Sequence, residues 1–427
     1  MVDKSKQTRR QFIRDVGTAA VATVAAARQP ARAQTAGTAG ANERLGIGFI
    51  GCGGRGSNHM EYVSKLKASG NAVEIVAVCD TYRPRMEKAA AKFGGKGYMD
   101  HRELLEDRNV DVVCISTPDH IHAAQVIDAV RAGKDVYCEK PVTHWRQFEL
   151  TRKMTEEVKK SGRVFILGTQ GMSDSAWHQA RRLVKEGLIG QPVHVECGYF
   201  RVGDWGERGM PIDDPNARPG KDLNWEAFLG DAPKREFDVS RYFRWRMYED
   251  YSGGPVTDLF PHTLTPPAWI LDVAFPSLVV ATGGKFRYSE REIPDTFNML
   301  IDYPEKYTVA VLGTQANDFP GGIARGAGNR SPVIRGWEGT LTFVGQDIVF
   351  TPAAGSKAAP RKIPVEKPED VLRYWADFLD CCRRRDVNTA SPVDLAFKVQ
   401  TALQMAMLGF REGKVARFDR DAMKILL

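Results

Sequence analysis

The sequence has no internal repeats, and no low-complexity tract or long hydrophobic run outside its N-terminal segment. No other apolar run approaches the ~20 residues that a membrane-spanning helix requires, so we expect no stable membrane anchor. Net charge is also scarce, because residues 1–33 carry +5 of the formal +7 and leave the rest of the chain nearly neutral. Composition therefore gives no support to nucleic acid as a partner.

The chain also lacks the cysteine pattern of a disulfide-rich exported protein. Its seven cysteines are odd in number, and Cys52, Cys79, Cys114 and Cys138 fall in or at the ends of apparent strands. Such thiols are typically small buried apolar groups. With 427 residues, 43% of them apolar and 26% charged, we expect a globular protein with two domains.

The N-terminal segment has the three parts of an export signal. Arg9 and Arg10 precede a mildly apolar stretch, and Ala31-Arg32-Ala33 matches an A-x-A cleavage pattern. An amphipathic N-terminal helix is the alternative.

The stretch TRRQFI resembles a twin-arginine signal, which implies the twin-arginine export machinery as a partner. We therefore expect a signal peptide over 1–33, a flexible linker over 34–43 and a periplasmic or secreted location. Because this route carries folded proteins, folding in the reducing cytoplasm would keep the thiols free.

From residue 44 onward, short apolar runs alternate with helical stretches. Continuous apolar runs are typical of strands buried on both faces of a sheet. The expected strands are 45–50, 73–79, 110–116, 134–138 and 163–167, and the expected helices are 57–68, 84–93, 121–132 and 143–161. This alternation predicts an α/β fold with a doubly wound parallel sheet over 44–168.

Beyond about residue 190, strand-like segments follow one another and alternate apolar with polar residues. They are 192–200, 278–286, 296–303, 307–313, 340–345 and 347–350. This pattern predicts a second α/β domain over 169–427 with an open, largely antiparallel sheet. The irregular segment 201–251 has a length that is usually functional, and helices in 368–413 are expected to pack back on the first domain.

The run GCGGRG at 51–56 follows the first strand and opens a helix. Glycines in this G-x-G-x-x-G pattern allow a tight turn and close backbone approach, and the helix N-terminus favours a pyrophosphate. We therefore expect a dinucleotide at Gly51, Gly53, Gly54, Arg55 and Gly56, although a plain glycine cluster in a loop is the alternative.

The second strand ends at Asp80, where a carboxylate can bind a ribose 2′-hydroxyl and favour NAD. Arg83 follows closely and could meet a 2′-phosphate, so NADP stays possible. The surface-aspartate reading is the alternative.

Two further strand ends carry polar residues. Thr117, Pro118, His120 and His122 follow the third strand, and we interpret them as a loop over the dinucleotide. Asp-His-x-His could suggest metal ligands, but no matching His/Cys cluster completes such a site.

Glu139 and Lys140 follow the fourth strand, and we expect both at the cofactor, with Lys140 projecting towards the nicotinamide end of the site. A solvated surface lysine is its alternative reading.

The run GGPVTDLFPH at 253–262 places Asp258 and His262 four residues apart, on one face if the segment is helical. Pro261 would bend the helix there. A histidine beside a lysine and a carboxylate suits proton transfer near neutral pH, whereas an ordinary packed histidine is the alternative.

Four motifs together resemble the Gfo/Idh/MocA oxidoreductases over nearly the whole chain after the leader. They are GCGGRG, TPDHIHAAQVIDAVRAGKDVYCEKPV, ARRLVKEGLIGQPVHVE and DYSGGPVTDLFPH. The resemblance implies a Rossmann domain that binds NAD or NADP, a second domain whose open sheet often forms the contact of a homo-oligomer, and Lys140, Asp258 and His262 as catalytic residues. It also implies that the bond to Pro141 is often cis.

Two positions depart from the commonest family pattern. Phe260 stands where glycine is usual, and Thr265 stands where a second aspartate is usual. These departures bear on the size and orientation of the substrate more than on the reaction.

The expected reaction is hydride transfer from a sugar or polyol hydroxyl to the nicotinamide. His262 would take the hydroxyl proton, Asp258 would orient its ring, and Lys140 would stabilise charge on the oxygen. Gln170, Tyr199, Arg244 and Trp245 are candidate sugar contacts, as are Arg201, Trp205 and Tyr242, although the aromatic rings could equally form a core.

An exported enzyme of this kind would have to keep its cofactor and regenerate it internally. One sugar could be oxidised while a second is reduced, as in the family's exported glucose-fructose oxidoreductases. An NAD-dependent glycoside hydrolase, which oxidises its substrate transiently, is the alternative. A non-catalytic sugar sensor and an inactive relative complete the options.

Overall fold

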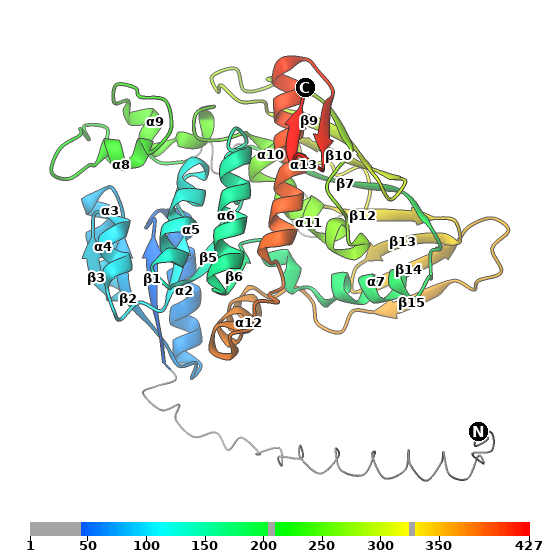
Figure 1. Cartoon of the computed structure of the whole chain (residues 1–427), viewed down its shortest axis with the longest axis horizontal. Coiled ribbons are helices and arrows are strands. Elements are labelled where there is room, and N and C mark those ends of the chain that lie inside the picture. Colours follow the sequence, from blue (N-terminus) through cyan, green and yellow to red (C-terminus); the bar gives the residue numbers. More distant parts are fainter. Residues whose placement is uncertain (1–43, 204–209, 324–328) are drawn as a thin grey trace, which may run out of the picture. The chain divides into compact units, whose positions relative to one another are not determined.

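The computed structural model describes residues 44–203, 210–323 and 329–427, which build two sheets and the helices packed on them (Figure 1). The expected signal peptide and linker, residues 1–43, lie outside the described residues. Within the ranges just given, no helix combines the length and the apolar character that a membrane crossing demands.

The first sheet has six strands in the order β3-β2-β1-β4-β5-β6, and every pair in it is parallel. Its strands are β1 (Leu45–Ile50), β2 (Val73–Cys79), β3 (Lys96–Tyr98), β4 (Val112–Ile115), β5 (Asp135–Cys138) and β6 (Phe165–Leu167). The helices between them are α2 (Gly54–Ala68), α3 (Arg83–Phe93), α4 (His101–Glu106), α5 (His122–Arg131) and α6 (Phe148–Ser161), with η1 (Asp119–Ile121) before α5.

The continuous apolar runs form strands because both faces of this sheet are covered. All four residues of β4 and of β5 are buried. Helix α6 begins at Phe148, later than the periodicity predicts, because Gln147 closes a turn with its side chain on the backbone N–H of His144. Sequence patterning also missed β3 and α4, which are short.

The second sheet has eleven strands, and its path is β15-β14-β13-β12-β7-β10-β9-β8-β16-β17, with β11 paired to β7. The bounds are β7 (Pro192–Val202), β8 (Leu278–Gly284), β9 (Thr296–Tyr303), β10 (Tyr307–Thr314), β11 (Ala316–Asn317), β12 (Asn329–Gly336), β13 (Gly339–Val344), β14 (Asp347–Pro352), β15 (Arg361–Pro364), β16 (Ala416–Asp419) and β17 (Lys424–Leu426). Only β7 and β10 pair in parallel among these described strands. The predicted fold class, a doubly wound parallel sheet followed by a largely antiparallel one, is confirmed.

Helices of the second half are α7 (Ser175–Lys185), α8 (Trp225–Leu229), α9 (Val239–Phe243), α10 (Pro255–Asp258), α11 (Phe260–Leu271), α12 (Val371–Arg384) and α13 (Val393–Glu412), with η2 (Gln170–Ser173) and η3 (Trp245–Met247). Helix α13 contacts α6, α11 and β8, so it lies between the two sheets (Figure 1). Helix α12 packs against α2. The end of the chain therefore stabilises the first sheet as well as the second.

Residues 210–252, called the insertion below, form a small core of their own rich in aromatic rings, among them Trp225, Phe228 and Tyr242. The insertion carries α8 and α9, which Figure 1 shows beyond the ends of α3 and α5. An isolated β-bridge between Tyr82 and Leu223 fixes it to the loop after β2. The insertion therefore covers one end of the parallel sheet.

All seven cysteines lie in the described part of the chain, and all are buried free thiols. Burial raises the pKa of Cys52 and of Cys79 well above the ordinary value, which keeps both protonated and unreactive. The prediction of buried apolar thiols is confirmed.

Candidate active site

A cavity of about 1290 Å³ opens where β1, β2, β4 and β5 end. Its walls come from the glycine-rich turn, the loops after β2 and β4, Lys140, the insertion and the segment from Asp258 to His262. A site for one small molecule usually measures ~300–1,000 Å³, so this cavity has room for a dinucleotide and a small substrate together.

The glycine-rich turn fits a pyrophosphate. Gly51 has φ +94°, and a Cβ on Gly56 would lie 1.9 Å from the backbone oxygen of Gly51, so only glycine allows this close packing of α2 on β1. A Cβ on Gly54 would meet nothing within 4 Å, and on Gly53 only Arg85 at 3.6 Å, so the backbone is open to the cavity there. No side chain caps the start of α2, which leaves its N–H groups available to an anion.

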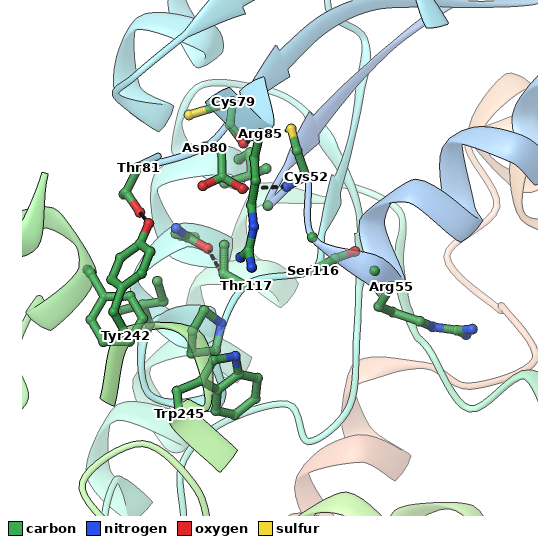
Figure 2. A pocket seen from close by; sticks show the side chains of 18 of the residues that line it. Cys52, Arg55, Cys79, Asp80, Thr81, Arg85, Ser116, Thr117, Tyr242 and Trp245 are labelled. Carbon is green, nitrogen blue, oxygen red and sulfur yellow. Dashed lines mark hydrogen bonds between the residues drawn. The ribbon is translucent and has the colours of Figure 1, made fainter. Parts of the chain in front are cut away.

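Asp80 sits at the end of β2 and lines the cavity (Figure 2). Its Oδ2 accepts from the backbone N–H of Cys52 at 2.8 Å, and its Oδ1 accepts from that of Tyr82 at 2.9 Å. Burial raises the pKa of Asp80, and the Arg85 guanidinium and these two donors act against that rise. The carboxylate is thus fixed where a ribose hydroxyl can reach it.

The two arginines after β2 have different places. Arg83 donates to Asp222 Oδ1 at 2.9 Å and does not line the cavity. Arg85 does line it (Figure 2). Its guanidinium pairs with Asp213 at 2.5 Å. Sequence reasoning chose Arg83 from its proximity to Asp80 and missed Arg85, which the direction of α3 turns inward.

The loop after β4 divides into residues that line the cavity and residues that support it. Thr117 and Pro118 line it. The ring of His120 contacts the backbone oxygen of Phe228 at 2.7 Å, and His122 contacts the backbone oxygens of Thr117 at 2.8 Å and Pro141 at 2.7 Å. Burial lowers the pKa of His120 to about 4.

Neither His120 nor His122 faces the cavity, so both support the loops rather than line the site. Throughout the described ranges, no group of three or more His, Cys, Asp or Glu side chains is arranged to hold a metal ion.

Lys140 and Asp258 form an ion pair at the floor of the cavity. Lys140 Nζ lies 2.7 Å from Asp258 Oδ1, and the Lys140–Pro141 bond is cis. Burial would raise the pKa of Asp258, but the charges of Lys140, Arg246 and Arg201 outweigh it and hold that pKa below its usual range. Asp258 is therefore a permanent carboxylate.

His262 lines the same cavity beside Lys140. Burial and the Lys140 charge together lower the pKa of His262 to about 3, so the ring is neutral at physiological pH and able to accept a proton. Within the described structure, Asp258 hydrogen-bonds Lys140 and Arg201 and not the His262 ring, so the expectation that Asp258 orients that ring is corrected.

The helix around these residues breaks at Leu259, because α10 ends at Asp258 and α11 begins at Phe260. Pro261 lies in the first turn of α11, where its missing N–H costs no helical hydrogen bond. The helix is therefore interrupted at Leu259 and not at Pro261, where the sequence predicts a bend. The spacing of Asp258 and His262 still turns both towards the cavity.

The two departures from the family pattern lie outside the cavity lining. Phe260 is fully buried, and a Cβ on Gly313 would lie 2.4 Å from its ring. The Thr265 hydroxyl donates to the backbone oxygen of Pro261 at 2.6 Å within α11. Both residues fill the core beneath the site and do not shape the cavity wall.

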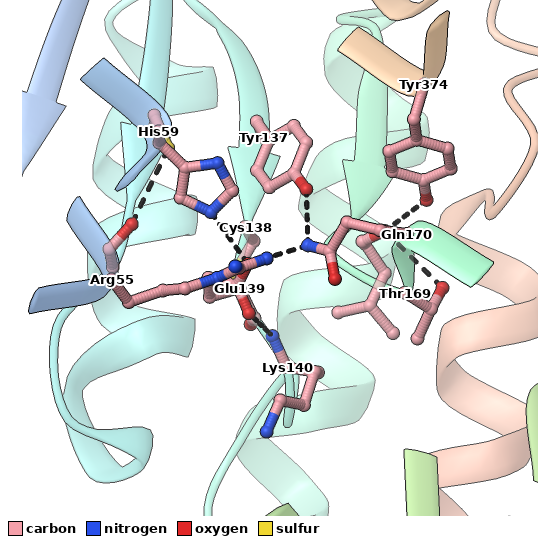
Figure 3. Close-up of polar contacts among 12 residues, drawn as sticks. Arg55, His59, Tyr137, Cys138, Glu139, Lys140, Thr169, Gln170 and Tyr374 are labelled. Carbon is pink, nitrogen blue, oxygen red and sulfur yellow. Dashed lines mark hydrogen bonds and ion pairs between the residues drawn. The ribbon is translucent and has the colours of Figure 1, made fainter. Parts of the chain in front are cut away.

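Glu139 is the centre of a cluster of hydrogen-bonded polar side chains next to Lys140 (Figure 3). Arg55 Nε donates to its Oε1 at 2.9 Å, and Gln170 Nε2 donates to the same oxygen at 2.8 Å and contacts the hydroxyl of Tyr137 at 2.6 Å. Figure 2 shows the Arg55 guanidinium directed away from Asp80. Gln170, expected to bind sugar, and Glu139, expected to bind the cofactor, thus lie in this cluster outside the lining.

Of the remaining sugar-contact candidates, some line the cavity and others do not. Tyr199 and Trp245 line the cavity together with Tyr242 and Arg201, whereas Arg244 donates to the backbone oxygen of Met210 at 3.0 Å outside the lining. Trp205 lies outside the described residues.

Arg246 is a lining residue that sequence reasoning missed. It approaches Asp258 Oδ1 with Nε at 3.5 Å. Its only sequence signal is its place beside Trp245.

Comparisons with known proteins agree with this architecture. Residues 45–169 match the family model described as "Oxidoreductase family, NAD-binding Rossmann fold", and residues 173–306 match that of its C-terminal alpha/beta domain. Inositol 2-dehydrogenase of Salmonella typhimurium is 31% identical over 39% of this chain and 49% of its own length. Myo-inositol 2-dehydrogenase of Thermotoga maritima is 31% identical over 48% of this chain and 56% of its own length. The matched regions thus span about half of these relatives.

Solved structures share the fold. The WlbA dehydrogenase from Bordetella pertussis, in complex with NADH and UDP-GlcNAcA, aligns with 88% of this chain and 99% of its own at a TM-score of 0.63 and 18% identity. Levoglucosan dehydrogenase, in complex with NADH and levoglucosan, aligns with 90% of this chain and 99% of its own at a TM-score of 0.63 and 19% identity. The two family models together match more than half of the sequence, and the chain therefore belongs to the Gfo/Idh/MocA family of oxidoreductases.

Proposed function

We propose that this protein is an NAD-dependent dehydrogenase that oxidises a secondary hydroxyl of a sugar or polyol. The observation that carries the proposal is the convergence of Lys140, Asp258 and His262 in one cavity with the glycine-rich turn. The inositol 2-dehydrogenases act on a polyol, and their likeness to this chain supports that substrate class.

The chain's own residues supply the proton chemistry. The nicotinamide ring, when bound, accepts the hydride. His262 is neutral and takes the hydroxyl proton, while the Lys140 ammonium donates to the same oxygen and stabilises the charge that develops on it. Asp258 holds that ammonium through two contacts, at 2.6 and 2.7 Å, so its direction is set before substrate binds.

Asp80 supports NAD over NADP. Its carboxylate is held by two backbone N–H groups at the end of β2, where it accepts from a ribose 2′-hydroxyl and repels a 2′-phosphate. Arg85 is the residue through which NADP could still bind, because it lines the cavity beside Asp80.

The insertion supports a cofactor that stays bound through turnover. The Tyr242 hydroxyl lies 2.8 Å from Thr81 Oγ1, the Asn224 N–H donates to the backbone oxygen of Thr81 at 2.8 Å, and Arg85 pairs with Asp213 at 2.5 Å. These links hold the insertion beside the loop after β2, at the ribose-binding end of the cavity, and we expect them to slow the release of a dinucleotide.

Export and oligomer formation are further parts of the proposal. Residues 1–33 support a folded, periplasmic or secreted enzyme, for which a retained cofactor is an advantage because free NAD is made in the cytoplasm. A homo-oligomer is supported by Leu300 and Val344, apolar side chains 49% and 45% exposed on strands of the open sheet. Light scattering on the purified protein measures the oligomer.

The experiment that tests the function is mass spectrometry of a panel of sugars and inositols before and after incubation with the purified holo-protein and NAD. We expect one sugar or polyol of the panel to lose two hydrogens and a second sugar to gain two, because NADH that stays bound must be reoxidised before the next turnover. Nicotinamide absorbance should therefore grow by no more than one equivalent of protein. Release of nitrophenol from nitrophenyl glycosides without net oxidation would show the glycoside-hydrolase reaction instead. Dinucleotide binding without any turnover would indicate that the protein is a non-catalytic sugar sensor.

A further inference from the structure

One fully buried histidine connects helix α12 to the segment after β5 that carries Lys140. His59 lies on α2 with an exposed fraction of 0%. Trp375 Nε1, on α12, lies 3.0 Å from His59 Nδ1. On the other side of the ring, His59 Nε2 lies 2.7 Å from Glu139 Oε1 (Figure 3). The chain of contacts thus runs from Trp375 through His59 to the residue directly before Lys140.

The two partners of His59 allow only one protonation state of its ring. An indole N–H can only donate, so His59 Nδ1 accepts from Trp375 and carries no proton. A carboxylate only accepts, so His59 Nε2 carries the proton and donates to Glu139. The ring is therefore neutral and has a fixed tautomer. Burial acts in the same direction, because it lowers the pKa of His59.

The fixed position of the Glu139 carboxylate in turn constrains the backbone of Lys140. Its Oε1 accepts from His59, Arg55 and Gln170, and its Oε2 accepts from the backbone N–H of Lys140 at 3.2 Å. Burial would raise the pKa of Glu139, but Arg55 and the His59 hydrogen bond hold it well below the ordinary value. Glu139 is therefore a fixed carboxylate, and the donors on Oε1 determine where Oε2 points.

Trp375 is itself held firmly. Its ring stacks on Tyr137 with centroids 4.3 Å apart and planes 3° from parallel. The Tyr137 hydroxyl in turn lies 2.6 Å from Gln170 Nε2, which donates to Glu139. The cluster closes on itself, so removal of one N–H leaves a buried partner unsatisfied rather than free to rearrange.

We propose that Trp375 and His59 are positioning residues for Lys140, which fix the Glu139 carboxylate and through it the backbone that presents the ammonium to substrate. The proposal rests on the catalytic role of Lys140 given under the proposed function. Lys140 is then held at both ends, at its N–H by Glu139 and at its Nζ by Asp258.

Histidine substitutions separate the contact to Glu139 from the contact to Trp375. In His59→Gln the amide nitrogen takes the place of Nε2 and still donates to Glu139. In His59→Asn the amide reaches only as far as Nδ1, so the Glu139 contact is lost. We expect kcat near that of the native protein for His59→Gln and a fall of about ten- to a hundred-fold for His59→Asn, the effect of a small misplacement of a catalytic group, with the affinity for NAD unchanged in both.

Two neighbouring residues of α12 provide a test variant and its matched control, Trp375→Phe and Tyr374→Phe. Trp375→Phe keeps a ring against Tyr137 and removes the N–H that fixes the tautomer of His59, so kcat should fall about tenfold or more. His59→Gln is spared this effect because its amide has no tautomer to lose. Tyr374→Phe removes a buried hydrogen bond to the backbone oxygen of Leu167, outside the path to Glu139, and should leave kcat unchanged. Thermal unfolding of each variant shows how much of its loss is a loss of fold.

The tautomer gives a readout that does not depend on activity. In protein labelled with ¹⁵N-histidine, the His59 signals are assigned by their loss in His59→Gln. We expect the native ring to keep its proton on Nε2 from pH 6 to 9, and Trp375→Phe to lose this fixed state.

The possible results distinguish the two proposals. A native His59 ring with its proton on Nδ1 overturns the inference, as do native kcat values for His59→Asn and Trp375→Phe, or an equal loss in His59→Gln and His59→Asn. In each of these cases turnover by the native protein leaves the proposed function standing. Absence of turnover by the native protein, with the tautomer as expected, overturns the proposed function instead.

Discussion

The Nζ of Lys140 lies 2.7 Å from Oδ1 of Asp258 and 2.6 Å from the backbone oxygen of the same residue. The two residues are 118 positions apart in the sequence, and one follows strand β5 of the parallel sheet while the other ends helix α10, between strands β7 and β8 of the second sheet. The contact therefore joins the cofactor-binding half of the fold to the half that completes the cavity.

Removal of the Lys140 ammonium should abolish turnover and spare the fold. Lys140→Met should lower kcat by about 10²- to 10⁴-fold, because the developing charge on oxygen loses its donor and the proton transfer loses its partner. Steady-state kinetics with the substrate found by mass spectrometry measures this effect. NAD affinity within twofold of native, by fluorescence titration, is the control, and native kcat in the variant would refute the assignment.

Alanine at two glycines of the same turn should act in opposite ways. At Gly54→Ala the new methyl group points into open space on the cavity side, so we expect weaker NAD binding and native stability. At Gly56→Ala the methyl group would lie 1.9 Å from the Gly51 oxygen, and we expect a loss of about 1–3 kcal/mol in the free energy of unfolding. Urea denaturation and NAD titration of both variants measure the contrast, and equal effects on binding and stability would contradict it.

Neutralising Asp80 should weaken the preference for NAD. In Asp80→Asn, a charged acceptor for the ribose hydroxyl becomes neutral, so the ratio of the affinity of the cofactor-free protein for NAD to its affinity for NADP should fall about tenfold or more. Arg83→Ala is the matched control, because Arg83 pairs with Asp222 away from the cavity and should leave the ratio unchanged. A change in the ratio with Arg83→Ala alone would reverse the assignment.

Loosening the insertion should release the cofactor. Tyr242→Phe removes the hydroxyl that contacts Thr81, so more dinucleotide should be lost during gel filtration, as measured by nicotinamide absorbance in the protein peak. Tyr248→Phe is the control, because its hydroxyl donates to Ser240 within the insertion and makes no link to Thr81. If the native protein already loses all of its dinucleotide on desalting, the insertion does not retain it.

Stability should fall in mild acid. Burial lowers the pKa of His262 and His144 to about 3 and that of His120 to about 4, so below the ordinary 6.5 the unfolded chain binds protons that the folded chain does not. Each such histidine costs up to about 1.4 kcal/mol per pH unit as the pH falls from 6.5 towards its folded pKa. Asp119, whose pKa burial raises to about 7, acts in the opposite direction between 7 and 3.8.

The net effect of these four groups is uptake of about two protons on unfolding near pH 5, hence a free energy of unfolding that decreases between pH 6.5 and 4. Urea denaturation at several pH values measures the slope. His120→Gln should make the slope shallower by about one proton. A slope that is flat, or unchanged in this variant, would contradict the buried neutral state of these rings.

The amino-acid sequence by itself determined the parallel sheet, the antiparallel sheet and the glycine-rich turn. Strands buried on both faces need unbroken apolar runs, and half-covered strands need alternation, so local patterning carries this information. Gly51 and Gly56 could also be assigned to the turn from the sequence, because only glycine suits these two positions. Gly51 has a positive φ, and Gly56 has no space for a Cβ.

Only the tertiary structure decided which polar side chains face the cavity. Gln170 and Arg244 turn away from it while Arg85 and Arg246 turn into it, and Asp258 pairs with Lys140 instead of His262. Each of these outcomes depends on the direction of a side chain at a contact between segments far apart in the chain. The residue types and spacing within one segment do not show which side chain of a distant segment will contact it.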